Sequence, residues 1–205
     1  MFTPDRQKAI TSDEALERLK AGNARFLAGR TINCDLMAQV KATASKQAPF
    51  AAILGCIDSR VPPELVFDQR IGDVFTARVA GNFANTDILG SLEFATKVEG
   101  AKLIVVLGHS ECGAVKGAVD HVQLGNLTAT LANIMPAVEA SKGVDGEQNS
   151  KNKKLVQKVA EANVALTVAA LTKRSAVLSE LVAAKQLRIV GGMHDLGTGR
   201  VELLG

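Results

Sequence analysis

The sequence has no tryptophan and no tyrosine, and aromatic residues make up only 3% of its 205 residues. Side chains that could stack on nucleic-acid bases are therefore scarce. An excess of one charge is also lacking, because 24 basic residues are balanced by 21 acidic ones and no basic run is longer than Lys153-Lys154. This composition indicates an ordinary mixed-charge surface and argues against a nucleic-acid partner.

Long apolar runs and paired cysteines are missing as well. No uninterrupted apolar stretch reaches the ~18 residues of a membrane-spanning helix, so we expect no membrane partner. The opening MFTPDRQKAITSDE lacks the apolar segment of a secretory signal. We expect a cytoplasmic protein, or a periplasmic one if a signal peptide has been removed. Three cysteines are an odd number, which favours thiol or metal chemistry over a disulfide framework.

Hydropathy periodicity predicts an α/β fold. Short apolar runs, several of them closed by glycine, predict strands at 49–56, 73–79, 102–108, 187–191 and 200–203. Helical spacing of apolar residues predicts helices at about 12–28, 88–98, 113–122, 127–140, 154–172 and 176–185. Because strands alternate with helices, we expect a mainly parallel central sheet of four to five strands flanked by helices. We expect one domain, 1–205, with an N-terminal helical arm at about 1–45.

Reactive side chains follow two of the predicted strands. Cys56 comes directly after AAILG, and His109 and Cys112 come directly after LIVVLG. The carboxyl ends of parallel strands form one edge of a sheet, so these three side chains are expected to converge. Two thiolates and one imidazole suit zinc, and three protein ligands leave the fourth position open for catalysis. Cys34 has no such neighbours and is expected to be a packed core residue.

Other interpretations of these residues fit less well. A Cys56–Cys112 disulfide is the main structural alternative, and a Cys–His nucleophile pair stays open. A phosphatase loop needs five residues between cysteine and arginine, whereas Cys56 and Arg60 are separated by three. No Walker A motif is present, and no glycine-rich dinucleotide motif follows the first strand.

Four stretches of the chain closely resemble the β-class carbonic anhydrases. They are CIDSRVPPE at 56–64, GDVFTARVAGN at 72–82, SLEFA at 91–95 and GHSECGAV at 108–115. The resemblance runs in the same order from about Leu16 to Val201. It implies a mainly parallel α/β sheet and a homodimer that often pairs into a homotetramer.

The resemblance implies a lyase that reversibly hydrates CO2 to bicarbonate and a proton, with one Zn2+ per chain on Cys56, His109 and Cys112. Zinc would lower the pKa of a coordinated water and so provide the hydroxide that attacks CO2. Asp58 and Arg60 are the implied catalytic pair. The guanidinium holds the carboxylate ionised and away from zinc, where it can orient the hydroxide.

The resemblance also implies a substrate cleft and a subgroup. The implied substrate-binding residues are Gln47, Phe75, Ala80, Phe94 and Gly113. Phe94 would come from the dimer partner, and it replaces a common tyrosine. Ile53 and His194 stand where a bicarbonate-inhibited subgroup has tryptophan and tyrosine, although Arg78 matches that subgroup's arginine. We therefore expect the open-site subgroup, in which Gln47 orients the substrate.

Some functional questions stay open at the level of sequence. His121, expected on a surface helix, and His194 are possible proton shuttles only because imidazoles titrate near neutrality. A related zinc hydrolase acting on another small linear substrate, such as CS2, is the alternative enzyme. A non-enzymatic zinc or scaffold protein would keep the metal ligands but has no need of Asp58 and Arg60.

Overall fold

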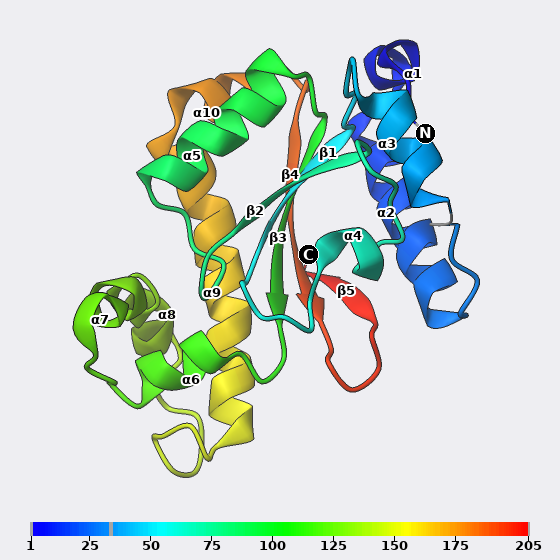
Figure 1. Cartoon of the computed structure of the whole chain (residues 1–205). Helices are drawn as coiled ribbons and strands as arrows, with labels where there is room; N and C mark the ends of the chain where they lie inside the picture. The colour runs from blue at the N-terminus through cyan, green and yellow to red at the C-terminus, as the bar shows by residue number, and fades with distance from the viewer. Residues whose placement is uncertain (1, 33–34, 205) are drawn as a thin grey trace.

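A five-stranded sheet forms the centre of the molecule (Figure 1), in a computed structural model that describes residues 2–32 and 35–204. The strand order is β2-β1-β3-β4-β5. The strands are β1 (Ala51–Gly55), β2 (Val74–Arg78), β3 (Leu103–His109), β4 (Arg188–His194) and β5 (Val201–Leu204). Only β5 is antiparallel to its neighbour, which confirms the predicted mainly parallel sheet. Cys34 lies outside the described residues.

The two central strands explain the apolar runs of the sequence. Every residue of β1 and β3 is buried, because helices cover both faces of the sheet. Parallel pairing places Gly55 of β1 opposite Leu107 of β3. The chain therefore leaves both strands at the same edge, where Cys56 and His109 follow.

Helices cover the sheet in two layers (Figure 1). On one face, α9 (Lys153–Arg174) packs Val159 and Val164 into a core with Ile104 and Val106 of β3, and α5 (Thr86–Glu93) and α10 (Ala176–Ala183) lie in the same layer. On the other face, α2 (Ser12–Leu27) packs against the sheet through apolar side chains. The second core includes Leu16, Leu19, Ile53 and Val105.

The N-terminal arm packs against the central sheet of the same chain. A capping box of Thr11 and Glu14 starts α2. Further along α2, the buried Asn23 donates from Nδ2 to Val66 O and Gly199 O, at 3.0 Å each, and accepts from Val201 N. These bonds connect the arm to the turn before β5. Two more helices of this region are α1 (Pro4–Ala9) and α3 (Leu36–Thr43).

Several boundaries differ from the prediction. The helix expected over 127–140 is two helices, α7 (Gly125–Ala132) and α8 (Met135–Ala140), because Pro136 has no N–H to continue the first one. The helix over 88–98 begins earlier, as α5, and ends in a π-helical turn, η1 (Phe94–Val98). His121 was expected on a helix, but it follows α6 (Gly113–Val119) at a φ of 52°. α1 and α4 (Pro63–Val66) were not predicted.

Among the described residues, no helix combines the length and the apolar character needed to cross a bilayer.

Candidate metal centre and active site

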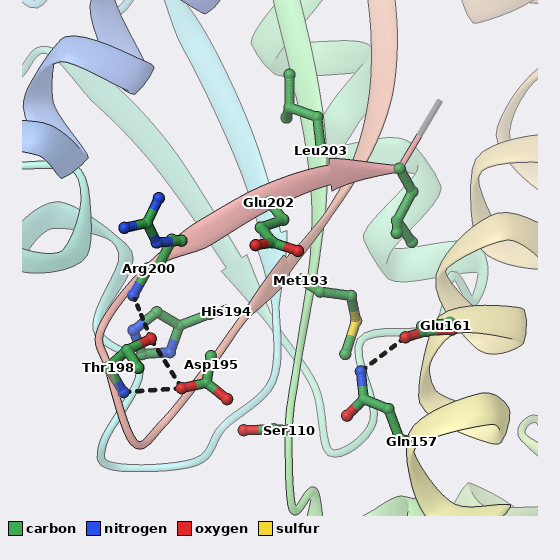
Figure 2. Close-up of a pocket in the computed structure, with 11 residues that line it drawn as sticks. Ser110, Gln157, Glu161, Met193, His194, Asp195, Thr198, Arg200, Glu202 and Leu203 are labelled. Carbon is green, nitrogen blue, oxygen red and sulfur yellow. Dashed lines mark hydrogen bonds between the residues drawn. The ribbon is translucent and has the colours of Figure 1, made fainter. Parts of the chain in front are cut away.

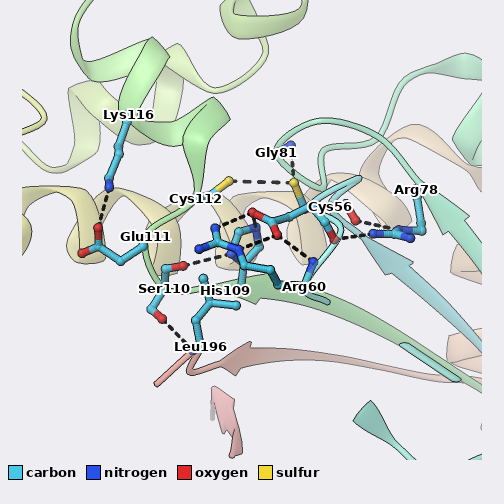
Figure 3. A network of polar contacts seen from close by, with 11 residues as sticks. Cys56, Arg60, Arg78, Gly81, His109, Ser110, Glu111, Cys112, Lys116 and Leu196 are labelled. Carbon is cyan, nitrogen blue, oxygen red and sulfur yellow. Dashed lines mark hydrogen bonds and ion pairs between the residues drawn. The ribbon is translucent and has the colours of Figure 1, made fainter. Parts of the chain in front are cut away.

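The structure brings Cys56, His109 and Cys112 together at the carboxyl edge of the sheet (Figure 3). Cys56 follows β1, His109 ends β3, and Cys112 is the N-cap of α6. One ligand atom from each residue lies within 4.8 Å of the other two. All three side chains are buried. The predicted convergence of these residues is therefore confirmed, as a direct consequence of parallel strand pairing.

His109 is oriented for metal binding. Its Nδ1 lies 2.9 Å from Ser110 O, and a carbonyl oxygen only accepts, so Nδ1 carries the proton. Nε2 is then the lone-pair nitrogen. Nε2 is buried and has no hydrogen-bond partner among the described residues. A metal ion is the partner that such a nitrogen fits, with the backbone carbonyl fixing the ring.

The two sulfurs form a coupled pair. Cys56 Sγ lies 3.9 Å from Cys112 Sγ, and both cysteines are free, so the disulfide alternative is not what the structure contains. The hydrogen-bond contact with Cys112 lowers the pKa of the Cys56 thiol, whereas the same contact and burial raise the pKa of Cys112. The pair thus holds one proton. A thiolate, a thiol that a metal ion can deprotonate and a free imidazole nitrogen suit zinc.

Asp58 and Arg60 form the predicted ion pair beside this centre. Arg60 Nε lies 2.9 Å from Asp58 Oδ1, and Nη2 lies 2.7 Å from Oδ2. The Arg60 backbone N–H donates to Oδ1 as well, at 3.0 Å. These contacts lower the pKa of Asp58 well below its usual range. Asp58 Oδ2 lies 4.0 Å from His109 Nε2, so an ionised carboxylate borders the metal centre.

Arg78 has a role that sequence reasoning missed. Its Nε donates to Cys56 O at 2.7 Å, and its Nη2 donates to Asp58 O at 2.6 Å. The side chain therefore fixes the backbone that carries the ligand and the carboxylate. The signal available was its register, since Arg78 pairs with Gly55 at the end of β1. Ile53, in contrast, is fully buried in the core against α2.

The predicted substrate residues do not form one group within the chain. Phe75 and Phe94 meet edge to face, with ring centroids 6.2 Å apart. They line a cavity of about 520 Å³ along β2 and α5. Ala80 and Gly113 lie next to Gly81 and Cys112, beside the metal centre. Gln47 is exposed before the start of β1, at the opposite end of that strand from Cys56, with Nε2 3.5 Å from Glu99 Oε2.

A second cavity, of about 390 Å³, lies between α9 and the β4–β5 hairpin (Figure 2). Carboxylates of Glu161, Asp195 and Glu202 line it, which does not suit an anionic product. His194 also borders it and pairs with His109 in the sheet. Burial lowers the pKa of His194. His121 is exposed.

Comparisons with known proteins agree with this site. A family model described as carbonic anhydrase matches residues 51–201. Carbonic anhydrase 2 of Mycobacterium tuberculosis is 38% identical over 190 residues, which cover 92% of this chain and 91% of that protein. The chain belongs to the carbonic anhydrase family. Its structural relatives further place it with the β-class enzymes of that family.

Two solved structures carry the fold comparison. The β-carbonic anhydrase CafA of Aspergillus fumigatus aligns with a TM-score of 0.73 at 27% identity, over 94% of this chain and 89% of that one. A tetrameric β-carbonic anhydrase of Sordaria macrospora aligns with a TM-score of 0.70 at 26% identity, over 94% and 98%. The fold and the sequence therefore lead to the same class.

Proposed function

We propose that this chain catalyses the reversible hydration of CO2 to bicarbonate and a proton, with one Zn2+ per chain held by Cys56, His109 and Cys112. The observation that carries the proposal is the meeting of three buried ligand atoms within 4.8 Å, beside an arginine-held carboxylate. A scaffold protein would need the three ligands but not that carboxylate. The carbonic anhydrase relatives favour CO2 over CS2 as substrate.

The bound zinc would supply Lewis acidity that makes a water molecule reactive near neutral pH. Residues of the chain would orient the reacting groups. Arg60 keeps Asp58 ionised and binds both of its oxygens, with Oδ2 held 4.0 Å from His109 Nε2. Asp58 Oδ2 accepts a hydrogen bond from the attacking oxygen, and so orients that oxygen's lone pair toward CO2. Arg78 holds the backbone of Cys56 and Asp58 in the required register.

We also propose that the protein belongs to the open-site subgroup. Both oxygens of Asp58 are bound by Arg60, which disfavours their use as zinc ligands. Arg78 is committed to two backbone carbonyls, and Ile53 is sealed in the core. These contacts support a site without a regulatory bicarbonate pocket. A crystal grown at pH 8 or above that shows Asp58 on zinc would contradict this assignment.

We also propose a homodimer or homotetramer. β2 is an edge strand of half-buried residues, and exposed Ile57, Phe94 and Val98 lie in or near the elements around it. Such an apolar, unpaired edge is typical of an interface. Gln47, remote from Cys56 within one chain, would then have to act in a partner's cleft. Light scattering after size exclusion measures the assembly, and a monomer at micromolar concentration would contradict it.

The test of the function is zinc content measured with stopped-flow CO2 hydration on the same sample. We expect about one zinc per chain and hydration that disappears with the metal and returns with it. CS2 hydrolysis serves as the control reaction. A metal-free purified protein that zinc does not activate, or activity on CS2 alone, would overturn the proposal.

A further inference from the structure

A tight turn places a backbone N–H on one of the metal-binding sulfurs. Gly81 N lies 3.4 Å from Cys56 Sγ (Figure 3). The turn runs from Val79 to Asn82 and is closed by Asn82 N–H donating to Val79 O at 3.0 Å. Gly81, its third residue, has a φ of 85°, as the third residue of a type II turn does. Glycine reaches this conformation freely, so something outside the turn must hold it in place.

Asn163 is that outside contact. Its Nδ2 donates to Gly81 O at 2.7 Å, across 82 positions of sequence, and the side chain is buried. It lies in the middle of α9, where the neighbouring Val159, Ala160 and Val164 are buried apolar residues. An amide in such surroundings is unfavourable unless it is hydrogen-bonded. The bond to Gly81 O is therefore the interaction that accounts for an asparagine at this position.

The two hydrogen bonds fix one peptide group from both ends. In the Gly81–Asn82 peptide, the N–H is held by Val79 O and the carbonyl by Asn163. Ile134 Cδ1 lies 2.4 Å from the position a Cβ would take, so a larger residue than glycine does not fit this turn without a shift. The fixed Gly81–Asn82 peptide favours the type II form of the turn, in which the preceding Ala80–Gly81 peptide presents its N–H to the sulfur.

An N–H on a metal-binding thiolate changes the metal's chemistry. Two thiolates and a neutral imidazole offset the whole charge of Zn2+, which weakens its pull on an oxygen ligand. A donor to sulfur withdraws part of that negative charge and restores electrophilicity. We propose that Asn163 is a positioning residue that, through Gly81, holds this N–H on Cys56 and limits electron donation by the thiolate. The inference rests on the metal centre proposed above.

The experiment compares Asn163→Leu with wild type after metal-free protein is loaded with Co2+ alone. Leucine has nearly the shape of asparagine but no donor. Without the held N–H, Cys56 donates more charge, so we expect the thiolate-to-cobalt charge-transfer band to move to longer wavelength. Competition with a chelator should also show zinc affinity changed by about 10-fold. Thr167→Val, one turn along α9 at another buried polar residue, is the matched control and should keep the wild-type band.

The outcomes separate the two proposals. A wild-type protein that shows no thiolate-to-cobalt band refutes the metal centre itself. A wild-type band that stays in place in Asn163→Leu, or that moves equally in Thr167→Val, overturns the role of Asn163. If Asn163→Leu does not fold, wild-type protein loaded with ¹¹³Cd decides. The Gly81 amide proton must then show scalar coupling to the metal through sulfur, and its absence overturns the inference.

Discussion

Arg60 binds both carboxylate oxygens of Asp58, through Nε to Oδ1 and Nη2 to Oδ2. The two residues are only two positions apart, so the pair forms within one short loop directly after Cys56. A planar guanidinium and a planar carboxylate match in this two-bond arrangement, which lysine cannot reproduce. The orientation of the Asp58 carboxylate therefore depends on one neighbouring residue, through its side chain and its backbone N–H.

Arg60→Leu should lower CO2 hydration by about 10-fold or more while zinc stays bound, because the released carboxylate loses its orientation and can occupy the metal position. Stopped-flow rates and zinc content on one sample measure this. Arg6→Leu is the control, since exposed Arg6 lies in α1. Hydration at the wild-type rate in Arg60→Leu would remove Arg60 from the catalytic pair.

The acid stability of the metal-free protein should depend on Asp58. The folded-state pKa of Asp58 is below its ordinary value of 3.8, so its contribution to stability is present above that value and is lost as pH falls through the folded pKa. Urea unfolding in the presence of a chelator gives the free energy of unfolding of wild type and Asp58→Asn. The difference between the two free energies should be largest near neutral pH and should narrow below about pH 4. A gap that is constant with pH would contradict the lowered pKa.

Zinc uptake should release about one proton per ion near neutral pH. Cys56, with its lowered pKa, is already a thiolate, whereas Cys112, with its raised pKa, still carries the shared proton until the metal displaces it. Calorimetry in buffers of different ionisation enthalpy counts the protons. Release of two would mean that both sulfurs are thiols in the metal-free protein, against the pairing described above.

Cys56→Ser should lose zinc and CO2 hydration together, because a hydroxyl is a poor replacement for a thiolate ligand. Metal analysis and stopped-flow hydration check both losses. Cys34→Ser is the matched control, and it should keep both properties. A Cys56→Ser protein with full zinc content would show that the ion is held elsewhere.

Gly81→Ala should destabilise the fold by about 2–4 kcal/mol, from a left-handed φ and a clash with Ile134 Cδ1. Two controls separate the causes. Gly29→Ala has a similar positive φ of 63° and no atom within 4 Å, so it should show the backbone cost alone. Ile134→Val removes Cδ1, so Gly81→Ala should cost less in that background. Thermal unfolding measures the loss of stability. If Gly81→Ala costs the same in the wild-type and Ile134→Val backgrounds, the clash with Ile134 is excluded.

Much of the fold was accessible from sequence because its main signals are local. The buried strands β1 and β3 read as apolar runs, and the reactive residues that follow them had to meet once the strands paired in parallel. The break at Pro136 was also local, yet the apolar pattern on both sides concealed it. Local patterns therefore predicted the elements better than their ends.

The contacts that complete the site are non-local. Nothing near Asn163 in sequence indicates Gly81, and Arg78 could be linked to the carbonyls of Cys56 and Asp58 only through strand register. Gln47 was placed in the cleft by resemblance, and one chain alone puts it at the far end of β1. Its role in substrate binding stays a prediction about the assembled protein.

The two sulfurs at the metal centre lie 3.9 Å apart, in direct contact. That spacing is short enough for an oxidant to join them after a small movement, so oxidation and zinc compete for the same electron pairs. A bound metal ion protects the two thiols from oxidation, whereas the metal-free thiols are open to it. We therefore expect zinc-loaded protein to keep its two thiols longer in an oxidant than metal-free protein does.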